Sequence, residues 1–299
     1  MMQYSSKLFN PKLKITSHPE LTRYLAGEKI VPINIELSIC GRCNVHCPWC
    51  FYDKQSGSIL DFTVTERFIL ECESLGVRAI TFTGGGEPTL HPRFKDIIKI
   101  SNIDKGLITN GLNIPQYDPS VFQWIRVSKT EKDLNLETLK KLRECKKLGI
   151  CINYIGNEDE VKEMLEIAYK LNIDYVQVRP ALNTDGALTF ITPPNIVDEK
   201  LESTPYKFKE AGTPRNYSKC TGFNFVPFIW ENGDLDVCAH QKGNKNYTLG
   251  NIYKNSLKEI LATTPRYVPV ESNCQICCKN HELNDLINSY DSLSDRNFV

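Results

Sequence analysis

Short segments of β-branched and other apolar residues recur along the first two thirds of the chain and alternate with longer stretches that carry apolar residues at helical spacing. Alternation of apolar and polar positions predicts strands, whereas apolar spacings of three and four predict amphipathic helices. Strands are predicted at 32–38, 78–82, 106–109, 124–128, 150–154 and 174–178, and helices at 64–75, 92–101, 134–148 and 158–171, with Gly76 and Gly149 as C-terminal caps. This order is typical of βα units on a parallel sheet, so the fold class is α/β with a partial, TIM-like (β/α)6 barrel.

One parity of the predicted strands carries polar side chains. These positions are Asn34, Glu36, Ser38, Thr81, Arg126, Ser128, Cys151, Asn153, Gln177 and Arg179. Because apolar layers normally fill the interior of a closed barrel, a polar parity predicts a lumen that is open to a ligand. The alternative is that these side chains face solvent at an uncovered edge of the sheet.

The alternation of strands and helices stops near 192–200, where Pro, Asn, Lys and Gly become frequent. We therefore predict a lead-in over 1–30, a core barrel over 31–195 and a small, cysteine-rich α+β domain over 196–299. Within this last domain the sequence predicts a hairpin around 231–234 and a helix at 256–263.

Positive and negative residues balance, with 36 Lys plus Arg against 36 Asp plus Glu. No excess positive charge is available to hold a polyanion, so no nucleic-acid partner is expected. The chain also lacks the apolar run of a signal peptide or of a membrane helix, which predicts a cytoplasmic protein without a membrane partner. In a reducing compartment the 12 cysteines indicate metal ligands or reactive thiols before disulfides.

Three cysteines are grouped directly after the first predicted strand. Cys43, Cys47 and Cys50 form a CxxxCxxC motif, and Trp49 precedes the last cysteine. Barrel enzymes carry their chemistry on loops at the carboxyl ends of strands. Three cysteines suit an iron-sulfur cluster with one iron left open to a small molecule, whereas a closed structural site uses four protein ligands. A zinc knuckle is the alternative interpretation.

This motif resembles the cluster-binding loop of the radical S-adenosylmethionine (SAM) superfamily. The resemblance implies that Cys43, Cys47 and Cys50 bind a 4Fe-4S cluster, whose open iron chelates the methionine amino and carboxylate groups of SAM. Electron transfer then yields a 5'-deoxyadenosyl radical, with an electron donor such as flavodoxin or ferredoxin. The match in order and strand placement covers about residues 32–180.

Further segments resemble the family's SAM-binding positions. Residues 83–88, Thr-Gly-Gly-Gly-Glu-Pro, follow the second predicted strand and resemble the GGE motif, whose backbone and Glu hold the methionine ammonium. By itself this segment reads as an ordinary turn from strand to helix. The resemblance implies SAM contacts from Trp49, Gly84, Gly85, Gly86, Glu87, Asn110, Ser128, Asn153 and Arg179. For Ser128, Asn153 and Arg179, contact with substrate or a supporting polar role remains open.

A second set of cysteines lies in the predicted C-terminal domain. Four of them, Cys220, Cys238, Cys274 and Cys277, can close one cluster. Their arrangement resembles the SPASM and twitch extensions of the same superfamily, which carry auxiliary iron-sulfur clusters. No cysteine follows Cys278, and Leu283 stands where a full SPASM unit has another, so one auxiliary 4Fe-4S cluster is predicted. A structural zinc site is the alternative.

The remaining cysteines divide into two kinds. Cys72 and Cys145 lie in predicted amphipathic helices and are interpreted as small buried hydrophobes, and the spacing of Cys40 does not fit a ligand. Cys151 shares the polar parity, and Cys278 adjoins a predicted ligand. Each is a candidate catalytic hydrogen donor to a substrate radical, with inert packing or ligation of the cluster as the alternative.

The resemblance implies a radical SAM enzyme that abstracts a hydrogen atom from a polar small molecule, such as a sugar or aminocyclitol, and so epimerises or oxidises it. Polar lumen positions such as Glu36, Gln177 and Arg179 suit a hydroxylated or aminated substrate. One alternative is a maturase that epimerises or cross-links a peptide. The alternative from another class is a noncatalytic iron-sulfur or zinc binding module, which would not require an intact GGGEP segment.

Overall fold

The computed structural model describes residues 10–50, 52, 56–181, 194–203, 217–270 and 280–293. A ten-stranded sheet runs through it in the order β11-β10-β9-β1-β2-β3-β4-β5-β6-β7. The seven core strands are β1 (Asn34–Ser38), β2 (Ala79–Thr83), β3 (Asp104–Thr109), β4 (Trp124–Ser128), β5 (Leu148–Tyr154), β6 (Tyr175–Pro180) and β7 (Leu201–Ser203), and each is parallel to its neighbour. The prediction of a partial TIM-like barrel is confirmed.

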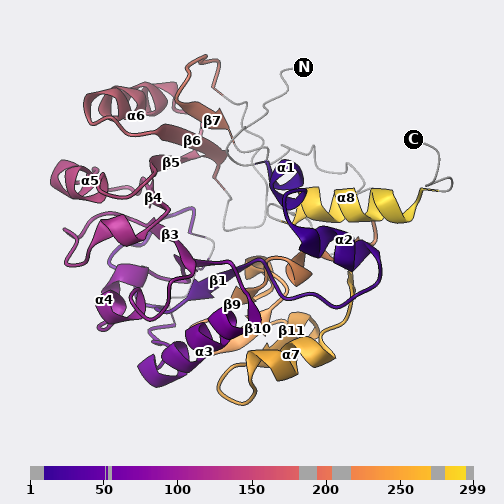
Figure 1. Cartoon of the computed structure of the whole chain (residues 1–299). Helices are drawn as coiled ribbons and strands as arrows, with labels where there is room; N and C mark the ends of the chain where they lie inside the picture. The colour runs from indigo at the N-terminus through magenta and orange to yellow at the C-terminus, as the bar shows by residue number, and fades with distance from the viewer. Residues whose placement is uncertain are drawn as a thin grey trace.

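Helices cover the outside of this curved row of strands (Figure 1). They are α3 (Phe62–Leu75), α4 (Phe94–Ile97), α5 (Leu136–Leu142) and α6 (Glu158–Lys170). Helix α3 begins where the Asp61 side chain accepts from the Val64 amide and ends at Gly76, whose φ of 91° is the left-handed C-cap that glycine favours. The strand predictions are thus accurate to a few residues, and α4 and α5 are shorter than predicted.

The prediction for Gly149 is wrong. This glycine does not cap a helix but lies inside β5, because α5 already ends at Leu142. A Cβ at Gly149 would meet the Tyr175 ring at 2.0 Å. Glycine is therefore required here by the close approach of an aromatic ring from β6 rather than by a helix terminus.

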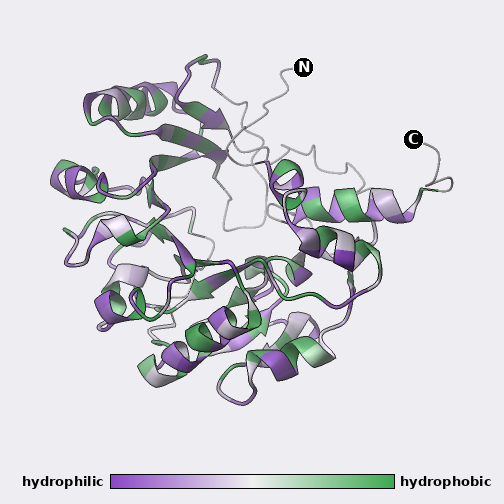
Figure 2. Ribbon diagram, viewed as in Figure 1, coloured by the Kyte–Doolittle hydropathy of each residue, from purple (hydrophilic) through white to green (hydrophobic). Residues whose placement is uncertain are grey.

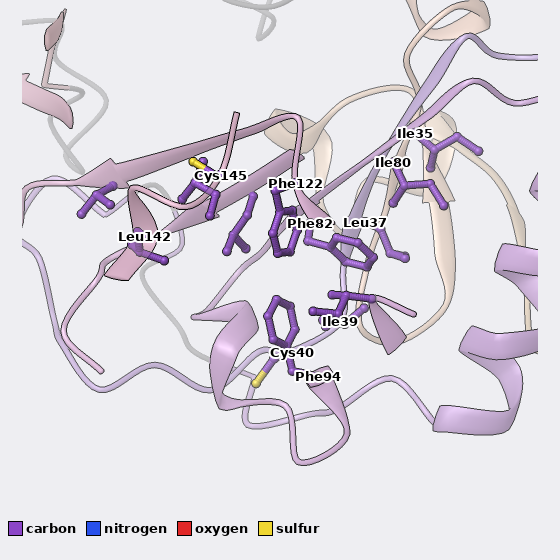
Figure 3. Packing of buried hydrophobic residues seen from close by; sticks show 14 of the residues in the cluster. Ile35, Leu37, Ile39, Cys40, Ile80, Phe82, Phe94, Phe122, Leu142 and Cys145 are labelled. Carbon is purple, nitrogen blue, oxygen red and sulfur yellow. The ribbon is translucent and has the colours of Figure 1, made fainter. Parts of the chain in front are cut away.

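The apolar parity of the strands packs under the helices. Ile35, Leu37, Ile80 and Phe82 are at most 1% exposed and belong to one core with residues of α3 to α6. Figure 3 shows the aromatic centre of this core, where Phe82 packs edge-on against Phe94 and Phe122. The helices show both hydrophilic and hydrophobic residues (Figure 2). The polar parity must therefore face away from the helices, toward the concave side of the sheet.

The C-terminal part of the chain extends the core sheet. Strand β9 (Phe228–Ile229) pairs in parallel with β1 on the side opposite β2, and β10 (Asp234–Asp236) and β11 (Thr248–Asn251) follow in antiparallel pairing. The predicted hairpin and helix are present, the latter as α7 (Leu257–Thr263). A two-stranded sheet joins β8 (Lys219–Cys220) to β12 (Val268–Pro269). The predicted boundary at 195/196 stays a prediction.

The lead-in packs against the C-terminal helix α8 (His281–Asp291). Helices α1 (Pro11–Ile15) and α2 (Pro19–Leu25) share a small apolar core with it, and Lys12 Nζ donates to Asp285 Oδ2 at 2.6 Å. Figure 1 shows α1 beside α8. Within the described part of the chain, no helix combines the length and apolar character that crossing a membrane requires.

Candidate active site

Three loops meet at the carboxyl ends of β1, β2 and β3: the cysteine loop (residues 43–50), the glycine loop (residues 84–87) and the β3 turn (residues 110–112). The Glu87 amide donates to Arg42 O at 2.7 Å, which joins the glycine loop to the start of the cysteine loop. The Asn110 side chain donates to Asn44 Oδ1 at 2.7 Å and contacts Cys43 Sγ at 3.8 Å. The structure therefore brings together residues that are 45 to 67 positions apart in the sequence.

The cysteine loop presents three half-buried thiols. The Cys50 amide donates to Cys47 O at 2.9 Å, which closes a turn around Trp49. Burial raises the pKa of the Cys47 thiol to about 11, and negative charge on Cys50 and Cys43 adds to the rise. Burial also raises the pKa of Cys43, with Cys50 again among the contributors. Burial therefore favours the protonated form of both Cys43 and Cys47.

The residue types of this loop suit an iron-sulfur cluster, because bound metal favours the thiolate that burial disfavours, but their side chains are not gathered into a metal site in this structure. Within the described residues, no three His, Cys, Asp or Glu side chains form a group that could hold a metal ion. Cys40 lies apart from the loop thiols: it is 0% exposed and belongs to the apolar core. Cys43, Cys47 and Cys50 stay the predicted ligands.

The glycine loop packs directly against the backbone of residues 40–42, which lead into the cysteine loop. A Cβ at Gly86 would lie 2.2 Å from Arg42 O, and one at Gly84 would lie 3.1 Å from Cys40 O. The Gly85 amide donates to the Ser38 hydroxyl at the end of β1 at 3.1 Å. Glycine at 86 is thus required by a close approach between two backbones, which leaves no room for a side chain.

Glu87 is 2% exposed, and both of its carboxylate oxygens are hydrogen-bonded inside the protein. Oε1 accepts from the amide and hydroxyl of Thr89 and from the Thr109 hydroxyl, and Oε2 accepts from the Asn110 amide at 2.7 Å. Burial raises the pKa of this carboxyl, although the hydrogen bonds act in the opposite direction. The side chain therefore fastens the glycine loop to the β3 turn, and its predicted contact with SAM stays a prediction.

Polar side chains of β4, β5 and β6 contact one another on the concave face, once across the intervening strand β5 and once between adjacent strands. Arg126 Nη1 donates to Gln177 Oε1 at 2.9 Å, and Arg179 Nε donates to Asn153 Oδ1 at 3.0 Å. Since the intervening residues of these strands lie in the helix-covered core, the predicted lumen positions share one face. Ser128 and Cys151 are register partners on this face. Cys151 is 0% exposed, and the SAM or substrate contacts of the layer stay predictions.

The structure brings Cys220 and Cys238 to the same small apolar core, formed around Phe223, Val237 and Tyr247. The Asn284 amide group of α8 donates to Cys220 Sγ at 3.5 Å, and Asn280 donates to Val237 O at 3.3 Å. Cys274, Cys277 and Cys278 lie outside the described residues. The auxiliary cluster stays a prediction.

Sequence reasoning missed a second buried carboxylate beside the glycine loop. Glu231, at the turn after β9, is 2% exposed and accepts from the hydroxyls of Ser38 and Ser56 and from Lys242 Nζ. Its segment, Glu-Asn-Gly-Asp, predicts only a hairpin turn. No local signal could have identified the site, because the partners of Glu231 lie 193, 175 and 11 residues away.

Comparison with known families gives one match over the core. The model described as "Radical SAM superfamily" matches residues 37–186, which is half of the chain. These residues include the cysteine loop, the glycine loop and all strands from β2 to β6.

Two curated relatives share part of this region. The S-adenosylmethionine-dependent nucleotide dehydratase of Flammeovirga pacifica is 26% identical over 179 residues, which is 55% of this chain and 60% of the relative. The GTP 3',8-cyclase of Chlorobaculum tepidum is 31% identical over 77 residues, 25% of this chain and 23% of the relative. The chain therefore spans less than two thirds of either protein.

Solved structures share the fold. Streptococcus suis SuiB bound to the precursor peptide SuiA has a TM-score of 0.65 at 15% identity, covering 98% of this chain and 81% of SuiB. The structure of anSMEcpe with bound AdoMet and a Cp18Cys peptide has a TM-score of 0.53 at 16% identity, covering 85% and 88%. At such identities the likeness concerns the fold alone.

Proposed function

Because the chain belongs to the radical SAM superfamily, we propose that this enzyme abstracts a hydrogen atom from a polar small molecule held on the concave face of the sheet. Cys43, Cys47 and Cys50 would hold the 4Fe-4S cluster. When bound, the cluster and SAM supply a 5'-deoxyadenosyl radical, with the electron coming from a donor such as flavodoxin or ferredoxin. The observation that carries the proposal is the meeting of the cysteine loop, the glycine loop and the β3 turn at one end of the barrel.

The concave layer supports a polar substrate. Arg126 Nε is buried and has no hydrogen-bond acceptor, and no carboxylate in the described part of the chain pairs with this guanidinium. A buried donor without an acceptor is costly, so the layer favours a substrate rich in oxygen acceptors, such as a sugar or aminocyclitol. The curated relatives named above act, by their names, on nucleotides, which are also polar small molecules.

Two outcomes for the substrate radical follow from the residues present. Return of a hydrogen atom from the thiol of Cys151 or Cys278 would epimerise the carbon and leave a thiyl radical for the electron donor to reduce. Loss of one electron to the auxiliary cluster, with a proton released, would oxidise a carbinol or amine. We propose Cys220, Cys238, Cys274 and Cys277 as the ligands of that cluster.

Anchoring of α8 beside Cys220 and Cys238 supports this proposal. Asn280 follows Cys277 by three residues, a span of at most about 11 Å, and it contacts the backbone of Val237, which precedes Cys238. Asn284 contacts Cys220 itself. A zinc site with the same four ligands is the alternative, and iron and zinc analysis of a Cys220→Ala variant separates the two.

Modification of a peptide is the second candidate function. It is favoured by the SuiB structure, which was solved with a precursor peptide and aligns with nearly the whole of this chain. This likeness concerns the fold, so it ranks below the small-molecule proposal. A noncatalytic metal-binding module would produce no 5'-deoxyadenosine.

The test is formation of 5'-deoxyadenosine from SAM by anaerobically reconstituted protein with dithionite. We expect product above the Cys47→Ala control, because this variant keeps only two of the three ligands. Product equal to that control would favour the noncatalytic module. With a substrate in hand, deuterium uptake from heavy water at an unchanged oxidation level indicates epimerisation, whereas loss of two hydrogens indicates oxidation.

A further inference from the structure

We propose that Glu231 is a positioning residue for SAM: carried by the C-terminal part of the chain, it sets the position of the glycine loop relative to the cysteine loop. The inference rests on the proposed function, since it concerns the same cofactor site. It assigns to the segment after β9 a role in the chemistry of the core barrel.

The topology places Glu231 at the end of β1. Strand β9 pairs in parallel with β1, with Glu36 opposite Phe228 and Leu37 opposite Ile229. Two residues beyond Ile229, the chain has passed the end of β1, where the cysteine loop departs. A side chain at 231 can therefore reach both loops that flank this strand.

The carboxylate joins three segments. Its Oε1 accepts from the Ser56 hydroxyl at 2.6 Å and from Lys242 Nζ at 2.6 Å, and its Oε2 accepts from the Ser38 hydroxyl at 3.0 Å. Ser38 in turn accepts from the Gly85 amide at 3.1 Å. A continuous chain of hydrogen bonds thus leads from Glu231 through Ser38 to a residue predicted to contact SAM.

Two glycines leave the space that the carboxylate fills. A Cβ at Gly41, next to the cysteine loop, would lie 3.0 Å from Glu231 Oε1 and 2.1 Å from the Ser56 hydroxyl. A Cβ at Gly85 would lie 3.6 Å from Glu231 Oε2 and 3.3 Å from Lys242 Nζ. The carboxylate therefore lies between the backbone of Gly41, just before the cysteine loop, and that of Gly85 in the glycine loop.

Lys242 keeps this buried carboxylate ionised. The side chain of Glu231 is 1% exposed, and burial acts to raise its pKa, but hydrogen bonds from Lys242 and Ser56 outweigh burial and lower the pKa. The ammonium group of Lys242 lies 4.2 Å from the centre of the Trp230 ring, whose π-face stabilises the cation. An ionised acceptor holds its hydroxyl donors more tightly than a neutral one does.

The test compares Glu231→Gln with Glu71→Gln in the anaerobically reconstituted full chain. Glu71 also joins the core to the C-terminal part, because its carboxylate accepts from the amides of Leu257 and Lys258 at 2.9 Å, but it does so on the helix-covered side. The readouts are iron content, the dissociation constant of SAM, and the KM for SAM separately from kcat in 5'-deoxyadenosine formation.

We expect Glu231→Gln to keep its iron, to bind SAM about tenfold more weakly and to raise the KM for SAM, with kcat at saturating SAM changed by less than about twofold. Glu71→Gln should bind SAM as the wild type does. Ser38→Ala removes both hydrogen bonds of this hydroxyl, the one to Glu231 and the one from Gly85, so it should weaken SAM binding as well. If both act through one chain, the double variant will lose less than the product of the two single effects.

Wild-type affinity for SAM in Glu231→Gln, or an equal loss in Glu71→Gln, would overturn the inference alone. Failure of the wild-type protein to bind SAM would overturn the inference together with the proposed function. If Glu231→Gln loses iron, its SAM binding is not informative, and the Ser38→Ala variant is measured in its place. Unchanged SAM binding in Ser38→Ala would then overturn the positioning role.

Discussion

A buried carboxylate lies on each side of the glycine loop, Glu87 toward β3 and Glu231 toward β9. The two carboxylates differ in the groups that donate hydrogen bonds to them. On the β3 side, the described residues that donate to Glu87 are all neutral, and its pKa is raised. On the β9 side, Glu231 accepts from a lysine as well as from hydroxyls, and its pKa is lowered. Burial raises the pKa of both carboxyls, and at Glu231 the hydrogen bond from Lys242 is the largest contribution that opposes it.

The comparison shows where the parts of the site come from. All partners of Glu87 lie within the residues that match the superfamily, whereas Glu231 and Lys242 come from the C-terminal part beyond residue 186. The β3 side is thus a property of the core barrel. If Glu231 has the positioning role proposed above, the cofactor site also depends on the rest of the chain.

The largest effect is expected from removing the β3 carboxylate. Glu87→Ala leaves the buried Asn110 amide and Thr109 hydroxyl without an acceptor, and we expect it to lower the free energy of unfolding by about 4 kcal/mol. Glu231→Ala should lose only about 2 kcal/mol, because Lys242 is partly exposed and can turn to water. Denaturant unfolding of both variants measures the two losses in the free energy of unfolding. A larger loss in Glu231→Ala than in Glu87→Ala would contradict the expected difference between the two carboxylates.

The next largest effect comes from the space available for a side chain at Gly86 and at Gly85. Gly86→Ala puts a Cβ against the Arg42 backbone, which cannot move without moving the cysteine loop, and should destabilise the protein by about 2 kcal/mol. Gly85→Ala meets the flexible end of Lys242 first and should lose less than about 1 kcal/mol. Thermal unfolding of the pair, with iron content as a second readout, checks this. An equal loss of stability in the two variants would contradict the expected difference between the Arg42 backbone and the Lys242 side chain.

A third prediction concerns pH on the β9 side. Asp236 accepts from Trp230 and Thr248 and forms no ion pair with another residue that the structure describes, and burial raises its pKa to about 6. A raised pKa means that the folded state favours the protonated form, so its contribution to stability is present at low pH and is lost as the pH rises. Relative to Asp236→Asn, the wild type should lose about 1 kcal/mol between about pH 5 and pH 7. Unfolding curves that keep a constant offset would contradict this.

The smallest effect is expected on the concave face, away from both carboxylates. Arg126→Gln keeps a polar side chain but removes the guanidinium, so the KM for the substrate should rise about fivefold while cleavage of SAM without substrate is unchanged. Steady-state kinetics with and without substrate measure both quantities. A fall in substrate-free cleavage would place Arg126 in the SAM site instead.

Local patterns were sufficient for much of the fold. Strand periodicity located β1 to β6, because alternation reports which side chains lie under the helices. The shortness of α5 and the position of Gly149 were not predicted, because the Tyr175 ring that occupies the space beside this glycine comes from another strand. Strand β7 carries only three residues, too few for a periodic signal.

The candidate site also has a part that the sequence predicted and a part that it did not. Spacing within Cys43–Cys50 and Gly84–Glu87 marks both loops, because each is a contiguous segment with its own chemistry. The role of Glu231 depends on serines that are 175 and 193 residues distant, and a contact between such positions leaves no trace in a single sequence. The side chain of Glu87 is a related case, since its motif identifies the residue but not the contacts with Thr109 and Asn110.

Electron paramagnetic resonance of the dithionite-reduced protein, recorded before and after addition of SAM, tests the central claim most directly. The account predicts the signal of a reduced 4Fe-4S cluster whose g-values shift when SAM binds the open iron, and loss of that shift in Cys47→Ala. A reconstituted wild-type protein without such a signal, or with one that SAM leaves unchanged, would contradict it.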